Sequence, residues 1–298
     1  MIQARAHPNE KNNLSPENRL YGFEMGLKKI LPPLLWTTLL WPITCSAQVT
    51  IAQISDTHIG EKRAPHAAEN LRKTVDMINA RPVDAVILTG DIGENPQYRK
   101  RAKAILKNLK APLYYVPGNH DVHTHDVSQY RAEFGKDYYR FHIKTIDFVV
   151  IDSQLLGNYD QYEAASPEPL PPETEVESEK MLAWLAQQQP AAGRTLIGAQ
   201  HIPAVRDDGF PPDKKPYWVI SEPYLSRELD LLHRLGVKHV LVGHWHNARV
   251  FFAKGISWHV APATSWLPWG GELGFTLHRI SPSGGVSTEF IPLPNAQP

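Results

Sequence analysis

The chain has 298 residues, of which 42% are hydrophobic and 21% are charged, so it holds enough apolar material for one large core or two small ones. Lysine and arginine number 31, as do aspartate and glutamate, and the formal net charge is zero. This balance excludes a broad basic surface of the kind that attracts nucleic acid, so we expect no nucleic-acid partner.

The N-terminal 47 residues read as export sequence rather than as part of the fold. Residues 1–24 form a polar extension, which would not be translated if synthesis of the protein starts at Met25. Basic residues then precede an apolar run over residues 30–43, and small residues follow up to Ala47, a pattern typical of a secretory signal peptide over residues 25–47. The run is short for a membrane span. We therefore expect cleavage after Ala47, a secreted or periplasmic protein and no stable membrane span.

Two alternatives to cleavage remain at this segment. An uncleaved signal would anchor the protein in the membrane. The single cysteine, Cys45, could be acylated in a lipoprotein, but Pro42 and Thr44 stand where such a site prefers leucine and a very small residue. With no second thiol in the chain, Cys45 cannot form an intramolecular disulfide.

From residue 48 to 298 we expect one domain, in which short apolar runs alternate with polar motifs and helical periods. This alternation is typical of an α/β fold. Strands are predicted at residues 49–54, 85–89, 113–116, 148–151, 195–199 and 237–242. Helices are predicted before Pro82 and before Gly236, and over residues 98–109 and 178–189.

The pattern changes after His246, where strand-like pieces are separated by glycine and proline turns. These pieces, at residues 249–253, 257–260, 274–280 and 286–291, are predicted to form a second sheet packed on the first. Residues 155–178 and 204–218 lack a period and are predicted to be loops that shape a substrate pocket.

Nearly every candidate functional residue comes directly after a predicted strand. Because ligands bind at the carboxyl ends of strands in open α/β sheets, motifs far apart in the sequence should converge on one crevice. The motifs are Asp56-x-His58, Gly90-Asp91, Gly118-Asn119-His120-Asp121, His201-x-Pro203 and Gly243-His244-x-His246.

Each motif alone has an ordinary structural explanation, as a helix cap or as a turn. Their appearance together, each at a strand end, indicates a site. Two carboxylates, four imidazoles and one amide oxygen form a mixed oxygen and nitrogen set without thiolate, which suits Mn, Fe, Zn or Co. A carboxylate such as Asp91, placed between two clusters, can bridge two ions roughly 3.5 to 4 Å apart.

These five motifs, in this order, resemble the calcineurin-like metallophosphoesterase superfamily over residues 50 to 262. The resemblance implies a four-layer αββα sandwich with two mixed β-sheets flanked by helices, and a pair of divalent or trivalent metal ions. It also implies that His120 is not a ligand but contacts phosphate and assists the leaving group, oriented by Asp121. The implied ligands are Asp56, His58, Asp91 and His246 for the first metal, and Asp91, Asn119, His201 and His244 for the second.

The predicted activity is metal-dependent phosphoester hydrolysis, in which a bridging hydroxide attacks phosphorus. Two ions would lower the pKa of a shared water to roughly 7 and offset the charge of the phosphoryl oxygens. We favour a phosphodiesterase of small or nucleotide-like substrates, because the arginine that protein phosphatases place after Gly-Asp has no match after Asp91. The sequence Gln200-His201 lacks the double histidine common in cyclic-nucleotide phosphodiesterases, which weakens that narrower assignment.

Other functions remain open. A phosphomonoesterase or protein phosphatase of the same superfamily is the first alternative, and a non-catalytic metal-binding scaffold is the second. A nuclease would need a basic groove that the balanced charge does not supply. The sequence does not identify the natural substrate, the metals or the oligomeric state.

Overall fold

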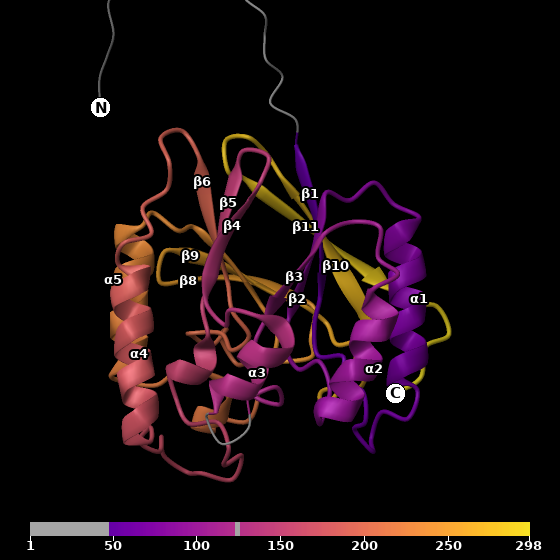
Figure 1. The fold of residues 1–298 in the computed structure, drawn as a ribbon, viewed down its shortest axis with the longest axis horizontal. Helices are drawn as coiled ribbons and strands as arrows, with labels where there is room; N and C mark the ends of the chain where they lie inside the picture. The colour runs from indigo at the N-terminus through magenta and orange to yellow at the C-terminus, as the bar shows by residue number, and fades with distance from the viewer. Residues whose placement is uncertain (1–47, 123–125) are drawn as a thin grey trace, which may run out of the picture. The chain divides into compact units, whose positions relative to one another are not determined.

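The computed structural model of the protein describes residues 48–122 and 126–298 (Figure 1). The expected N-terminal extension at residues 1–24 and the signal peptide at residues 25–47 lie outside the described residues and stay predictions. Within the part that is described, no helix has both the length and the apolar character needed to cross a bilayer.

The first sheet has five strands in the order β11-β10-β1-β2-β3. Its strands β1, β2 and β3 run parallel, whereas β10 and β11 extend the sheet antiparallel beside β1. The strands are β1 (Val49–Ile54), β2 (Ala85–Thr89), β3 (Leu113–Val116), β10 (Gly274–Ile280) and β11 (Val286–Pro292).

The second sheet has six strands in the order β4-β5-β6-β7-β9-β8, with a parallel centre and antiparallel edge strands β4 and β8. Both sheets are therefore mixed, as predicted. The strands are β4 (Tyr139–Ile143), β5 (Ile146–Val150), β6 (Thr195–Ala199), β7 (His239–Val242), β8 (Arg249–Ala253) and β9 (Ile256–Val260).

Helices cover the two outer faces. Helices α1 (Ala67–Asn79) and α2 (Pro96–Leu106) flank the first sheet, and α4 (Pro172–Leu185) and α5 (Tyr224–Arg234) flank the second (Figure 1). Three apolar layers hold these elements together, one under each pair of helices and one between the sheets. The predicted four-layer αββα sandwich is confirmed.

Alternate residues of the central strands enter different layers. On β2, Val86 and Leu88 pack under the helices, whereas Ala85 and Ile87 pack between the sheets. Since side chains alternate along a strand and both faces of each sheet are covered, these strands appear in the sequence as continuous apolar runs.

One prediction about the sheets is wrong. The strands after His246 do not form a second sheet of their own: β8 and β9 extend the six-stranded sheet beside β7, and β10 and β11 extend the five-stranded sheet beside β1. Apolar periodicity gives the face that a strand buries but not its neighbour.

Shorter elements also differ from the prediction. Helix α4 begins at Pro172, inside the segment predicted to be a loop, and the 3-10 helix η3 (Pro216–Trp218) ends the second loop. Helix α3 (Val127–Phe134) was not predicted, because only Val127 and Tyr130 of it are buried. Strand β4 was not predicted either, because four of its five residues are not fully buried and its apolar signal is weak.

Candidate metal centre and its cavity

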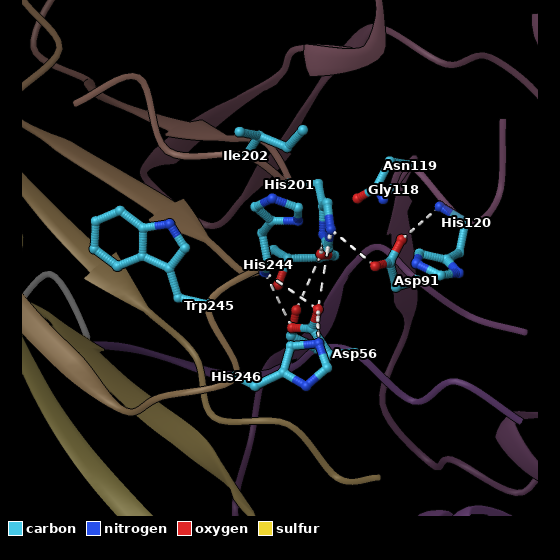
Figure 2. Close-up of polar contacts among 12 residues, drawn as sticks. Asp56, Asp91, Gly118, Asn119, His120, His201, Ile202, His244, Trp245 and His246 are labelled. Carbon is cyan, nitrogen blue, oxygen red and sulfur yellow. Dashed lines mark hydrogen bonds and ion pairs between the residues drawn. The ribbon is translucent and has the colours of Figure 1, made fainter. Parts of the chain in front are cut away.

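The predicted site residues come together at one edge of the two sheets. Residues after β1, β2 and β3 of the first sheet meet residues after β6 and β7 of the second (Figure 2). These residues form two groups whose ligand atoms lie close enough to hold a metal ion. The groups are Asp56, His58 and His246, and Asp91, His201 and His244; a third group, His58, Glu94 and His120, includes Glu94, which was not predicted.

The first group is compact. Nε2 of His246 lies 3.2 Å from Oδ1 of Asp56 and 3.2 Å from Nε2 of His58. All three residues are buried. Two imidazole nitrogens and a carboxylate oxygen of buried side chains therefore lie close together.

Asp91 joins the two groups. Its Oδ2 lies 3.1 Å from Nε2 of His201 and 3.3 Å from Nε2 of His58. Its Oδ1 accepts a hydrogen bond from the backbone amide of His120 at 2.9 Å. The carboxylate is thus fixed with one oxygen between a histidine of each group, which is the position a bridging ligand needs.

Asn119 lies beside the second group, as predicted. Its Nδ2 donates to the hydroxyl of Tyr217 at 2.9 Å. Its Oδ1 is buried and has no hydrogen-bond partner among the described residues. A buried amide oxygen without a partner costs free energy unless it binds a cation or water, so this atom fits a metal ligand.

The tautomers of the site histidines are also compatible with metal binding. Nδ1 of His201 donates to the carbonyl of Thr89 at 2.6 Å, and Nδ1 of His246 donates to the carbonyl of Trp266 at 2.8 Å. Because a carbonyl oxygen only accepts, each neutral ring keeps a lone pair on its inward Nε2. His244 has the opposite tautomer, since its Nε2 donates to the carbonyl of Tyr217 at 2.9 Å. Such outer hydrogen bonds are typical of metal-binding histidines.

The backbone under these side chains is strained. Five of the seven predicted ligands have positive φ angles although none is glycine: Asp56 (52°), His58 (39°), Asp91 (54°), His244 (68°) and His246 (51°). Each such conformation costs of order 1 to 3 kcal/mol, and strained residues of this kind cluster at functional sites. Hydrogen bonds between the loops hold them in place, for example from the amide of His58 to the carbonyl of Asp91 at 2.9 Å.

Two glycines of the sequence motifs are required because neighbouring atoms lie too close to them for a side chain to fit. A Cβ atom on Gly118 would lie 2.2 Å from Oδ1 of Asp91, and one on Gly243 would lie 2.0 Å from Oγ of Ser55. The glycines of the sequence motifs therefore make room for the residues that form the site.

The site attracts positive charge. Burial disfavours the ionised form of Asp91, yet His201 and His120 hold the pKa of this carboxyl well below its ordinary value. Burial would lower the pKa of His201, but Asp91 and Asp56 raise it to about 9. Burial and the charge of His201 lower the pKa of His244 to about 3, so this ring stays neutral. In the absence of metal, protons are held where cations would bind.

His120 lies next to the first group, with its ring centroid 4.6 Å from that of His58. Its Nδ1 is 3.0 Å from Oε2 of Glu94, and the other oxygen of Glu94 is 2.7 Å from Nδ1 of His58. The nearby histidines lower the pKa of Glu94 to about 2 against the effect of burial. Glu94 is therefore an ionised acceptor for both rings.

The role expected of Asp121 needs correction. Its oxygens accept the backbone amides of Ile92 at 2.9 Å and Gly118 at 3.1 Å, so Asp121 ties two site loops together. Burial and the charge of Asp91 raise its pKa to about 7. The carboxylate that orients the ring of His120 is Glu94. The family resemblance implied Asp121, whereas the residue that makes the contact lies 26 positions away in the sequence.

A cavity of about 620 Å³ opens over both groups. The two predicted loops contribute to its wall, through Tyr159, Asp160 and Tyr162 from one and Tyr217 and Trp218 from the other, as expected. Tyr217, Arg63 and Trp266 also line the cavity and were not among the predicted site residues. The guanidinium of Arg63 lies 3.8 Å from the centre of the Trp266 ring.

Comparisons with known proteins agree with this geometry. The model of the calcineurin-like phosphoesterase family matches residues 49–248, more than half of the chain, and the protein therefore belongs to this family. Membership makes it a metal-binding hydrolase of phosphoester bonds. This confirms the predicted family and the predicted general activity.

Individual relatives are distant. The chain is 24% identical over 226 residues to a probable cyclic nucleotide phosphodiesterase of Fibrobacter succinogenes, covering 72% of this chain and 79% of that protein. It is 26% identical over 196 residues to the serine/threonine-protein phosphatase CPPED1 of Bos taurus, covering 60% of this chain and 58% of that protein. A dimetal phosphatase of Danio rerio shares the fold with a TM-score of 0.60 at 16% identity, covering 82% of this chain and 99% of that structure.

Proposed function

We propose that the protein hydrolyses phosphodiesters of small, nucleotide-like substrates with two metal ions that share Asp91. The observation that carries the proposal is the position of Oδ2 of Asp91 between Nε2 of His58 and Nε2 of His201, at 3.3 and 3.1 Å. One carboxylate oxygen between two groups of ligand atoms supports a pair of ions rather than a single one.

The seven ligands divide between the two ions. Asp91 belongs to both sets, and the set without thiolate supports Mn, Fe, Zn or Co. When bound, the ions would lower the pKa of a shared water into the neutral range and offset the charge of the phosphoryl oxygens. The first ion takes Asp56, His58, Asp91 and His246, and the second takes Asp91, Asn119, His201 and His244.

His120 is the proposed proton donor to the departing alkoxide. Its ring lines the cavity, and its side chain is 25% exposed, so a substrate can reach it. Glu94 accepts a hydrogen bond from Nδ1, which fixes the orientation of the ring. Asp121 keeps the loops of Asp91 and His120 together through its two backbone contacts.

The cavity supports a small substrate with one negative charge. Its volume of about 620 Å³ lies within the range of small-molecule pockets. Among the described residues that line it, Arg63 is the only lysine or arginine. A phosphodiester carries less negative charge than a monoester and needs fewer cations around it. The aromatic wall supports a flat organic group on the ester, and includes Tyr159, Tyr162, Tyr217, Trp218, Trp266 and Trp269.

Steady-state kinetics on three esters tests the proposal. The Mn²⁺-loaded protein should hydrolyse bis(4-nitrophenyl) phosphate with a higher kcat/KM than 4-nitrophenyl phosphate or a phosphoserine peptide. A preference for the monoester would favour a phosphomonoesterase. A preference for the peptide would favour a protein phosphatase, the activity named for the bovine relative. Two bound ions without turnover of any ester would favour a metal-binding scaffold.

Export is proposed separately. The basic, apolar and small-residue pattern of residues 25–47 supports a signal peptide that is removed before the described domain, which begins with β1 at Val49. N-terminal sequencing of the protein recovered from the periplasm or medium of an expressing bacterium should begin at Gln48. Recovery of an intact N-terminus in the membrane fraction would favour the anchored alternative.

A further inference from the structure

Tyr217 contacts two of the proposed ligands of the second ion. It lies in η3, and its hydroxyl accepts a hydrogen bond from Nδ2 of Asn119 at 2.9 Å. Its carbonyl accepts a hydrogen bond from Nε2 of His244, also at 2.9 Å. The side chain and the backbone of one residue therefore hold two ligands that come from different sheets.

The contact with Asn119 determines which amide atom faces the ion. A carboxamide has one atom with lone pairs, Oδ1, and one atom with two N–H donors, Nδ2. Only Oδ1 can bind a cation, and it is this atom that is buried without a partner among the described residues. Nδ2 is then directed at Tyr217, whose oxygen must accept.

The hydroxyl proton of Tyr217 consequently takes no part in the hydrogen bond with Asn119. A phenol that accepts one hydrogen bond can donate another. Tyr217 lines the cavity above the metal groups together with Asn119 and His244. A donor at this wall suits an acceptor oxygen of a bound ester.

We propose that Tyr217 positions Asn119 and His244 for the second ion and that its hydroxyl donates a hydrogen bond to a phosphoryl oxygen of the substrate. The second half of this inference rests on the proposed hydrolase function. The first half concerns metal binding alone and can be tested without turnover.

A purely structural role for the ring makes a different prediction. The Tyr217 ring packs edge-on against Tyr162 and Trp218, with centroids 5.2 and 5.0 Å away. Phenylalanine would keep this packing and the backbone contact with His244, and would remove only the hydroxyl. The variant Tyr217→Phe therefore separates packing from hydrogen bonding.

Calorimetric titration of the metal-free protein with Mn²⁺ tests the positioning role. Tyr217→Phe should weaken binding of the second ion by roughly 10- to 100-fold, as the loss of an outer hydrogen bond to a ligand does, and leave the first ion unchanged. Tyr139→Phe is the matched control, since its hydroxyl donates to the carbonyl of Tyr115 at 2.8 Å, away from the site. Wild-type affinity for both ions in Tyr217→Phe would overturn the positioning role.

A double-mutant cycle tests whether the effect passes through Asn119. In the Asn119→Ala background, Tyr217→Phe should cause no further loss of Mn²⁺ affinity. An additive loss would overturn the coupling between the two side chains.

Kinetics at saturating Mn²⁺ tests the contact with substrate. Tyr217→Phe should lower kcat/KM for bis(4-nitrophenyl) phosphate by on the order of tenfold to a hundredfold, because a hydrogen bond to a charged oxygen is lost. Wild-type kcat and KM with both ions bound would overturn this contact. If the wild type binds two ions but hydrolyses no ester, the proposed function fails, whereas the titration still decides the positioning role.

Discussion

Nε2 of His58 and Nε2 of His246 face each other at 3.2 Å. The opposite nitrogen of each ring is held by an acceptor, Glu94 for His58 and the carbonyl of Trp266 for His246. With both rings neutral, two lone pairs point at each other beside the carboxylate of Asp56, which is favourable only with a cation between them. A proton or a metal ion can supply that charge.

Metal ions should therefore stabilise the fold. At a concentration of about one hundred times Kd, an ion that binds only the folded state adds about 2.7 kcal/mol to the free energy of unfolding. Treatment with EDTA should lower Tm by several degrees in differential scanning calorimetry, and Mn²⁺ should restore it. Mg²⁺, which prefers a cage of oxygen ligands, should restore less. An unchanged Tm with Mn, Fe, Zn and Co ions would contradict the predicted centre.

Replacement of His120 should separate chemistry from metal binding. His120→Ala removes the proposed proton donor but none of the seven ligands, so metal content should stay near two ions per chain. We expect kcat for the diester to fall by roughly 10²- to 10⁴-fold. The measurements are elemental analysis of the purified variant and initial rates. Loss of one ion in this variant would show that the ring of His120 is itself a ligand.

Glu94→Gln tests the carboxylate that holds two rings. The amide has one acceptor oxygen, so its NH₂ group must face Nδ1 of either His58 or His120, where a donor meets a donor. We expect a loss of roughly 10- to 100-fold in kcat/KM or Mn²⁺ affinity. Glu69→Gln, on the exposed side of α1 where it pairs with Lys73, is the control and should behave as wild type. Equal kinetics and equal Mn²⁺ binding in the two variants would show that Glu94 has no role in the site.

Gly118→Ala tests the close approach beneath Asp91. The new Cβ would lie 2.2 Å from Oδ1 and 2.3 Å from the backbone nitrogen of Asp91, so the loop must move. We expect the free energy of unfolding to fall by about 1 to 3 kcal/mol and both ions to bind more weakly. Urea denaturation and Mn²⁺ titration measure these effects. Gly285→Ala, with a nearest neighbour 3.3 Å away, should change Mn²⁺ binding little.

Much of the centre could be predicted because its residues follow strands whose buried runs are plain in the sequence. Asp56 follows β1, Asp91 follows β2 and His244 follows β7, and the parallel ends of such strands meet at one edge. The side-chain types then indicate a metal centre without thiolate. Neither step requires knowledge of how the loops fold.

The remaining contacts depend on loop geometry. Glu94 reaches His58 across 36 residues, and Tyr217 reaches Asn119 across 98. No local pattern in the sequence gives the pairing of two loops that are so far apart along the chain. The same limit explains the error about the last four strands, because β9 and β10 read alike in the sequence yet join different sheets.

A buried carboxyl group on α5 should make the free energy of unfolding depend on pH. Glu228 is completely buried, and burial raises its pKa to about 8, although Gln200 opposes the shift. The folded chain then keeps a proton that the unfolded chain loses near its ordinary pKa of about 4.5. Between these two values the folded state binds more protons, so this residue makes stability fall as pH rises, by about 1.4 kcal/mol per pH unit.

Glu228→Gln should remove this dependence. Urea denaturation near pH 5.5 and again near pH 7.5 should show the variant gaining about 2 to 3 kcal/mol relative to wild type at the higher pH. The comparison with wild type cancels the titration of the metal ligands, which both proteins share. Asp230→Asn, on the exposed face of the same helix, should show no such gain. The stability difference between Glu228→Gln and wild type could instead be the same at both pH values. Glu228 would then be ionised in the folded protein, and a group packed against α5 would have to stabilise its charge.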